Sequence, residues 1–306
     1  MRLASMLALL AVLCASAGRD RAAAAEPAAL TARHLASVAC VDRDTNLRFS
    51  PLGLAFGLEG DLYLVDADNS SIYRIDDSTL AGANPDPAPV LFARSPEELG
   101  RAELVDIVAD AGWFYVSERA GGLVAILDSR GDLVRADTVG QGIGGIGLDG
   151  AGAVYGAMTL AGSVVIADLW DGGSPIQCVP SVRGGQAYPL DCYCHRSGRV
   201  FVTDDFSRRV LILDALGKNL GVLEGFKFER PFGVCGYGRD LVLVSDSQLA
   251  SVAVFDSSGK WIAEFGRGHL KTPVFIAARD DGTVCVSDAA KMTVEVFRIE
   301  RFGDNQ

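Results

Sequence analysis

Short runs of alternating apolar and polar residues recur along the chain, and each is followed by a charged residue and a polar turn. The segments "DLYLVDADNSSIYRID" at Asp61 and "RVFVTDDFSRRVLILD" at Arg199 each contain two such runs on either side of a turn. Alternation with a period of two is typical of β-strands that bury one face. The pattern therefore predicts a series of β-hairpins.

The hairpins keep a constant register from one repeat to the next. The first runs end, in chain order, at Asp66, Glu118, Met158, Asp204, Asp246 and Asp288. A strand led by proline precedes four of the hairpins, as in "PLGLAF" at Pro51, and a fourth short strand follows most of them, as in "GKWIAEFG" at Gly259. One unit is thus four antiparallel strands in about 42 residues, which is the size of a propeller blade.

The repeated pattern P-x-G-(V/L)-x, followed by G-x-(L/V)-x-(V/L)-(S/T)-D and by (R/S)-(I/V)-x-(I/V)-(L/F)-D, resembles the NHL repeat. It covers roughly residues 35–302. Six units of this kind imply an all-β fold, a six-bladed β-propeller of four-stranded antiparallel blades. Propellers host unrelated activities, so the resemblance implies the fold and not the function.

The two ends of the repeat predict how the ring closes. The sixth unit ends at Arg298 with little chain left for a fourth strand, and an open blade exposes an unpaired strand edge. The run "HLASVACV" at His34 has a strand pattern and precedes the first unit, so we expect this N-terminal strand to close the ring. Glu118 and Met158 interrupt the series of strand-end aspartates, so we expect distortion in the second and third blades.

The N-terminus has the features of a secretory signal peptide. It contains the basic Arg2, an apolar run at residues 6–13 and small residues at 15–17. The run is too short to span a bilayer, which requires about 20 residues. We expect residues 1–25 to be a signal peptide and short leader and residues 26–306 to be the propeller, exported to the periplasm or the extracellular space as a monomer. A lipid anchor at Cys14 is the weaker alternative, because the bulky Leu13 precedes it.

The charge balance limits the class of partner. The chain has 28 basic and 39 acidic residues, a net charge of −11, and no run rich in Lys or Arg. An acidic surface repels phosphate backbones, so no nucleic-acid partner is expected. No later stretch is long and apolar enough for a transmembrane segment. A protein, a peptide or a small-molecule ligand is the expected partner.

The segment "PLDCYCHRSG" at Pro189 places two cysteines and a histidine close together, as a metal site does. The repeat alignment puts Cys192 and Cys194 on one face of the innermost strand of the fourth blade, with His195 beyond them at opposite parity. Zinc ligands must converge, so the alignment favours buried cysteines and a turn histidine over a zinc site. A disulfide from Cys178 to Cys192 or Cys194 is a further hypothesis, which an exported compartment permits.

Several six-bladed propeller families are enzymes, and each implies its own residues. Lactonases of the gluconolactonase type hold a divalent metal in the central channel with carboxylate and amide ligands, and two kinds of lyase use histidines. Here His34, His195 and His269 fall in three separate parts of the repeat, and the inner strands show no clear set of unrepeated Glu and Asn. The strand-end aspartates recur in most blades, so capping of the turns accounts for them.

No cofactor is therefore expected, and a structural or channel divalent cation is the alternative. A metal-dependent hydrolase or lactonase, or a lyase, is the alternative function.

The turns that differ between blades are the candidate binding surface. The turns after the first runs and the links between blades share one face of the predicted ring, and they contain unrepeated arginines and aromatic residues. Such a mixture suits peptide or carboxylate-bearing ligands. The sequence therefore favours a non-enzymatic exported binding or scaffold propeller, and a plain solvated rim is the alternative interpretation. The candidate ligand-binding residues are Arg119, Arg183, Tyr188, Asp205, Phe206, Arg208, Arg230, Gln248, His269 and Lys291.

Overall fold

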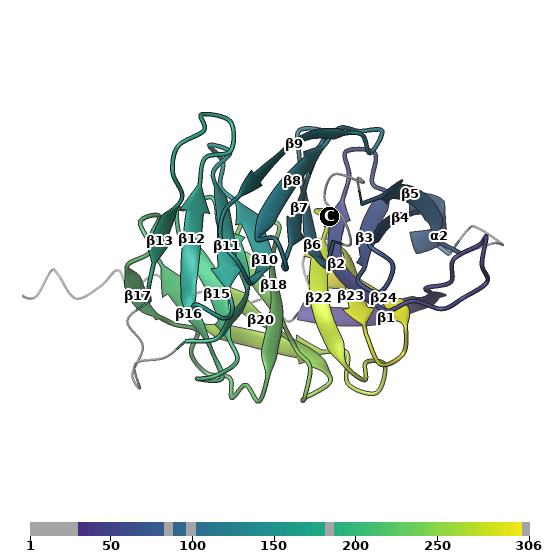
Figure 1. Cartoon of the computed structure of the whole chain (residues 1–306). Helices are drawn as coiled ribbons and strands as arrows, with labels where there is room; N and C mark the ends of the chain where they lie inside the picture. The colour runs from purple at the N-terminus through teal and green to yellow at the C-terminus, as the bar shows by residue number, and fades with distance from the viewer. Residues whose placement is uncertain (1–29, 83–87, 96–101, 181–186, 302–306) are drawn as a thin grey trace, which may run out of the picture. The chain divides into compact units, whose positions relative to one another are not determined.

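Antiparallel strands make up nearly all of the regular structure. The computed structural model describes residues 30–82, 88–95, 102–180 and 187–301. The strands in these ranges form six sheets of four strands each (Figure 1). One short helix, α2 (Asp77–Leu80), lies between strands of the first sheet, and nothing in the repeat pattern predicts it.

Each sheet is one blade, with its strands in order from the inside to the outside. The inner strands are β2 (Pro51–Phe56), β6 (Leu104–Asp110), β10 (Ile143–Leu148), β14 (Pro189–Cys194), β18 (Pro231–Tyr237) and β22 (Pro273–Ala278). The second strands are β3 (Leu62–Asp66), β7 (Trp113–Glu118), β11 (Val154–Met158), β15 (Val200–Asp204), β19 (Leu241–Asp246) and β23 (Thr283–Asp288). The third strands are β4 (Ser71–Ile75), β8 (Leu123–Leu127), β12 (Ser163–Ala167), β16 (Arg209–Leu213), β20 (Ser251–Asp256) and β24 (Thr293–Arg301). The outer strands are β5 (Val90–Arg94), β9 (Leu133–Thr138), β13 (Ile176–Cys178), β17 (Asn219–Val222), β21 (Trp261–Phe265) and β1 (Leu30–Ala39).

The inner strands form a closed ring. β2 contacts β6, and the contacts continue through β10, β14, β18 and β22 back to β2. The other strands of each sheet extend outward from this ring (Figure 1). The predicted all-β, six-bladed propeller is confirmed.

The N-terminal strand closes the sixth blade, as predicted. The order of that sheet is β1-β24-β23-β22, so β1 supplies the outer strand that the C-terminal repeat lacks. Val38 and Cys40, at the end of β1 and just after it, are buried in an apolar cluster that also contains Leu54 and Leu62 of the first blade. This packing joins the two ends of the repeat, and it removes the edge that an open blade would expose.

The turns of each blade define two faces of the ring. We call the link face the one that contains the turns between second and third strands, such as residues 67–70, together with the links between blades. The backbone N–H of Asp205, in such a turn, donates to the carbonyl of Tyr188, in a link, at 3.1 Å. The hairpin face contains the turns between inner and second strands, such as residues 57–61.

The strand-end carboxylates stabilise the turns and links of the link face. Asp246 is buried, and its carboxylate accepts the backbone N–H groups of Gln248 and Leu249 at 3.0 and 2.9 Å. Glu118 replaces aspartate in the second blade and binds the N–H groups of Ala120 and Gly121 in the same way, at 2.8 and 2.6 Å. The distortion expected in the second and third blades is not found, because both keep four paired strands.

Every inner strand shifts its register against the second strand shortly after its first residue. In the first blade Pro51 pairs with Asp66 and Leu54 pairs with Leu64, so residues 52 and 53 form a bulge. The same shift occurs in the other five inner strands. A bulge leaves backbone groups without partners in the ladder, so side chains have to bind them. At the level of the bulges, therefore, side chains have to supply hydrogen bonds that the strand ladder supplies elsewhere in the ring.

No helix among the described residues is long and apolar enough to cross a membrane.

Candidate functional site

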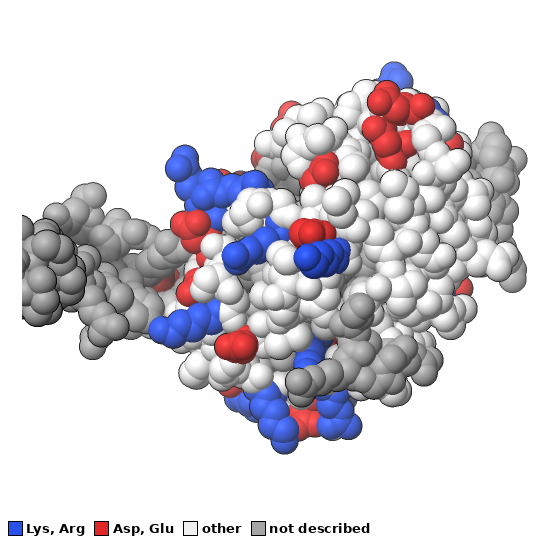
Figure 2. Space-filling view, turned by 90° about the vertical axis from the view of Figure 1, so that its left-hand side faces the viewer, with Lys and Arg blue, Asp and Glu red and all other residues white. Residues whose placement is uncertain are grey.

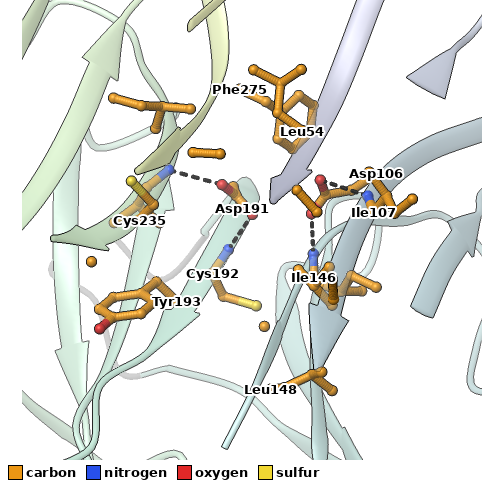
Figure 3. Close-up of a pocket in the computed structure, with 18 of the residues that line it drawn as sticks. Leu54, Asp106, Ile107, Ile146, Leu148, Asp191, Cys192, Tyr193, Cys235 and Phe275 are labelled. Carbon is orange, nitrogen blue, oxygen red and sulfur yellow. Dashed lines mark hydrogen bonds between the residues drawn. The ribbon is translucent and has the colours of Figure 1, made fainter. Parts of the chain in front are cut away.

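A cavity of about 280 Å³ lies where the six inner strands meet (Figure 3). All six inner strands contribute to its wall, and most of the lining side chains are apolar. Leu54, Ile107, Ile146, Leu148 and Val234 are among them. A concave apolar site with a few polar groups is the common form of a small-molecule site.

One ring of equivalent positions forms the floor of this cavity. These are the third residues of the six inner strands, at or next to the bulge, and they are Gly53, Asp106, Gly145, Asp191, Gly233 and Phe275. Glycine therefore alternates with a larger residue around the ring. Asp106, Asp191 and Phe275 line the cavity, and Figure 3 shows the two carboxylates at the same level of the channel.

Each glycine makes room for the larger residue of the next blade. A Cβ atom on Gly145 would lie 2.8 Å from Cα of Asp191, and one on Gly233 would lie 2.8 Å from Cα of Phe275. A Cβ on Gly53 would collide with Asp106 in the same way. The alternation is thus a packing requirement at the narrowest part of the ring.

Each aspartate binds the bulges of its own blade and of the next one. Asp106 accepts the N–H of Ile107 through Oδ1 at 2.8 Å and the N–H of Ile146 through Oδ2 at 2.9 Å. Asp191 accepts the N–H of Cys192 at 2.7 Å and that of Val234 at 2.8 Å. Each carboxylate therefore joins two neighbouring blades, and every one of its oxygens still has a free lone pair.

Both carboxyl groups are buried, and burial affects their ionisation. Burial raises the pKa of Asp106 to about 7, although the bonds from Ile146 and Ile107 oppose this shift. Burial also raises the pKa of Asp191 well above its usual value, and the charge of Asp106 adds to the effect. Ionisation of one group thus disfavours ionisation of the other, and the pair titrates as a unit.

The cavity extends from this floor toward the hairpin face. Its lining runs from the bulge level to Phe56, Ala109, Leu148 and Ala278, near the ends of the inner strands that enter the hairpin turns. On the link side of the floor an apolar cluster of Val105, Val274 and Phe275, with Leu52 and Phe232 packed against it, fills the space between the inner strands. The channel is therefore blind at its link end.

The candidate residues from the sequence lie on the link face, away from the cavity. The basic ones are engaged in ion pairs: Arg119 with Glu103 at 3.0 Å, Arg208 with Glu229 at 2.8 Å, Arg230 with Asp205 at 3.5 Å, and Lys291 with Glu295 at 2.6 Å. Arg183 lies outside the described residues. On the side of the molecule in Figure 2, basic and acidic side chains are likewise interspersed on a largely uncharged surface.

The structure brings some of these residues together. Tyr188 and Phe206 are exposed and lie at the link and the turn where Asp205, Arg208 and Arg230 are also found. Lys291 donates to the carbonyl of His269 at 2.7 Å near the closing strand. Arg119 lies in the second blade, away from these two groups. Gln248 lies in the turn after β19, where its backbone N–H donates to the strand-end Asp246.

The expectation of three separate histidines is wrong for one pair. The ring of His34, on the closing strand β1, stacks on that of His269, with centroids 4.3 Å apart. Nε2 of His34 also lies 2.7 Å from the buried carboxylate of Glu295. The outer position of β1 in the sixth blade brings His34 next to the link that carries His269, a side-chain contact that the linear repeat does not reveal. His195 stays separate and contacts Ser197 and the carbonyl of Arg239.

The proposed disulfide is also wrong, because all six cysteines among the described residues are free thiols. Sγ of Cys178 contacts the carbonyl of Leu216 in an outer hairpin of the fourth blade, at 3.2 Å. Cys192 and Cys194 are instead buried on the inner strand, as the repeat alignment predicts. Cys235 lines the cavity and is only partly buried, so it is not a pure core residue.

The cavity does not fit the metal site of a lactonase-type propeller. Among its lining residues only Asp106 and Asp191 bear carboxylates, and no histidine or side-chain amide joins them. Divalent cations such as calcium take six to eight oxygen ligands, and both carboxylates already bind backbone N–H groups. No group of three metal-ligating side chains occurs anywhere in the part of the chain that the structure describes.

Comparisons with known proteins support the fold. No family model matches the sequence, and no characterised protein matches it in sequence. A virginiamycin B lyase from Staphylococcus aureus is similar in structure, with a TM-score of 0.60 and 12% identity over 88% of this chain and 99% of its own. A gluconolactonase from Xanthomonas campestris has a TM-score of 0.68 and 13% identity over 90% of this chain and 96% of its own.

A protein of unknown function from Bacteroides thetaiotaomicron has a TM-score of 0.68 and 11% identity, over 89% of this chain and 76% of its own. At these identities the similarity shows the six-bladed propeller fold alone. The assignment to NHL repeats specifically stays a prediction.

Asp106 and Asp191 are not among the candidate residues predicted from the sequence, although the sequence contains a signal for both. The pattern P-x-G has aspartate instead of glycine in "PLDCYC" at Pro189, and "LVDIVAD" at Leu104 has aspartate at the same place. Reading the third position of every inner strand in order gives the alternation directly. What the sequence does not show is that these positions face the axis.

Proposed function

We propose that this chain is a non-enzymatic binding propeller, and that its central cavity takes a small organic cation with an apolar body. The observation that supports this proposal is the pair of buried carboxyl groups, Asp106 and Asp191, at the floor of a blind apolar cavity. The apolar walls favour a hydrocarbon body. The floor favours a group that donates hydrogen bonds and carries positive charge.

The charge of the floor sets the preferred head group. When the pair is ionised it is acidic and buried, and a carboxylate ligand would add a further negative charge at the same place. A primary ammonium group supplies three N–H donors and a compensating charge. The aromatic rings of Phe56, Tyr193 and Phe275 in the wall are also favourable surfaces for a cation.

Ammonium binding is expected to depend on pH. A cation prefers the ionised carboxylates, so its affinity rises as the pair loses protons. Since burial raises the pKa of Asp106 to about 7, the affinity should increase between pH 5 and pH 8. Isothermal titration calorimetry in buffers of different ionisation enthalpy will also measure the protons that binding releases.

The test compares three probes of equal length: n-hexylamine, n-hexanol and hexanoate. On the unmodified protein we expect hexylamine to bind at least about tenfold more tightly than the other two, because a hydrogen-bonded charge pair contributes about 1.5–3 kcal/mol. Asp106→Asn and Asp191→Asn should each reduce that preference. Asp132→Asn is the matched control, because Asp132 is exposed on the surface.

Equal affinity for the three probes would contradict the acidic floor as the recognition element. Absence of binding by any of them would contradict the cavity as the site. Both outcomes are measured on the unmodified protein, so they do not depend on whether the variants fold.

The link face is a second candidate, for a protein, peptide or carboxylate-bearing partner. The observation that favours it is the exposure of Phe206 and Tyr188, at 59% and 38%, next to Arg208 and Arg230. Exposed aromatic residues beside arginine are common at protein interfaces. The two arginines are already paired with acidic neighbours, so a partner has to replace these pairs.

The test of this second candidate is capture of partners from an extract of the source cells. Arg208→Glu together with Arg230→Glu should release them, and Arg130→Glu on a distant turn should not. Retention of every captured partner by the double variant would count against the link face.

A further inference from the structure

A second cavity lies beside the axial one and shares part of its lining. This second cavity, of about 160 Å³, lies at the hairpin face between the first and second blades. Phe56 and Ala109 line both cavities, so the two meet at these residues. We call the second cavity the side groove, and its lining residues are Phe56, Gly57, Leu58, Ala109, Asp110, Ala111, Gly112 and Phe114.

Two hairpin turns with small residues line the side groove. Gly57 and Gly112 lie in the turns after β2 and β6, and Gly112 has a φ of 88°, a conformation that side chains other than glycine rarely adopt. Leu58 is 80% exposed at the edge of the groove, while Phe114 is buried at its base. An exposed leucine next to a buried phenylalanine gives the groove apolar walls, and the exposed Asp110 also lines it.

A network around Arg279 holds the junction in place. Its guanidinium lies over the ring of Phe56, with Cζ 5.4 Å from the centroid. Nη1 donates to the carbonyl of Gly60 at 2.9 Å and to Asp77 at 2.7 Å, and Nη2 donates to Asp281 at 2.8 Å. Arg279 thus ties the sixth blade to the first hairpin and keeps Phe56 at the side of the passage.

We propose that the ligand of this protein is elongated, with its polar head at the floor of the axial cavity and an unbranched hydrocarbon tail in the side groove. This inference rests on the proposed function and adds a second subsite to it. The shared lining of the two cavities at Phe56 and Ala109 argues for one occupant. A tail that leaves the axis at this point buries its methylenes against Leu58 and Phe114.

The experiment measures the affinity of a series of n-alkylamines, from propyl to dodecyl, by calorimetry on the full chain. Each methylene that enters the apolar surface should tighten binding by up to about fourfold. We expect the increase to continue beyond the length that fills the axial cavity. A bulky branched end on the long amines should reduce the additional gain, because the side groove holds only about 160 Å³.

Two variants separate the subsites. Ala109→Leu fills the junction, so it should abolish the gain from longer chains. Leu58→Ala removes an exposed wall of the groove without touching the core, and it should weaken only the long amines. Ala151→Leu, at an exposed position in a hairpin turn of the third blade, is the control.

The outcomes distinguish the two proposals. If no amine of any length binds, the proposed function is wrong. If short amines bind but affinity stops increasing once the axial cavity is filled, or if Leu58→Ala affects all lengths equally, the side groove is not a tail site and only this inference is overturned.

Discussion

The carboxylate of Asp191 lies against Gly145 of the preceding blade, at a point where any side chain on residue 145 collides with it. Both oxygens of Asp191 are held by backbone N–H groups, so the carboxylate has nowhere to move. Gly145→Ala should therefore destabilise the protein by about 1–3 kcal/mol, the usual cost of overpacking. Urea unfolding followed by tryptophan fluorescence measures this change.

The control for that substitution is Gly150→Ala. No heavy atom lies within 4 Å of a Cβ built on Gly150, so its effect should stay within about 0.5 kcal/mol. Equal effects of the two substitutions would mean that the ring of alternating glycines is not tightly packed.

The buried pair of aspartates should make the stability decrease as the pH rises. The folded-state pKa of Asp106 is about 7 against an ordinary 3.8, so the folded state holds the proton more tightly than the unfolded chain. The corresponding stabilisation is present at low pH and is lost as the pH rises from about 4 through 7. Asp106→Asn lacks this titrating group, so its unfolding free energy should fall less over that range. Parallel pH profiles for the two proteins would contradict the shift.

Loss of the carboxylate that caps the turn after β19 should lower the free energy of unfolding strongly. Asp246 is fully buried and accepts four backbone N–H groups, two in its own turn and two in the link before β18. Asp246→Ala leaves these donors without a partner and should cost at least about 2 kcal/mol. Asp240→Ala, which removes only an exposed pair with Arg196, should cost less than about 1 kcal/mol. Similar costs would show that the cap does not stabilise the link.

Closure of the ring should depend on Glu295. This side chain is fully buried on β24, and Ser37 and His34 of β1 bind one of its oxygens at 2.6 and 2.7 Å, while Lys291 and Thr293 bind the other at 2.6 Å. Glu295→Ala should cost about 2–4 kcal/mol, because it leaves buried donors unpaired. Amide hydrogen exchange should increase first in residues 30–39, since they are paired only with β24.

The pH dependence of this contact has the opposite sign to that of Asp106. Burial alone raises the pKa of Glu295, but the four hydrogen bonds outweigh it and hold the pKa below its ordinary 4.5. Its contribution is complete above pH 4.5 and is lost as the pH falls through the folded-state pKa. Glu300→Gln, at an exposed position of the same strand, is the control. It should leave the pH dependence of the unfolding free energy unchanged, both below pH 4.5 and between pH 4 and 7.

The repeat pattern determined most of the fold. Alternation of apolar residues, the recurring strand ends from Asp66 to Asp288 and the missing strand after Arg298 predicted six blades and the closing strand, because each of these features is local or periodic. The same logic predicted that the strand-end carboxylates cap the turns. It also placed Cys192 and Cys194 in the core, since residues two apart on a strand share a face.

Only the tertiary structure decided which residues meet. The stacking of His34 on His269 and the free state of Cys178 depend on distances between blades, which a linear repeat does not contain. For the same reason, the sequence predicted a candidate site on the link face, whereas the structure has its candidate site on the axis. Asp106 and Asp191 are ordinary single deviations in the sequence, and they come together at the floor of a cavity only because six bulges converge on one axis.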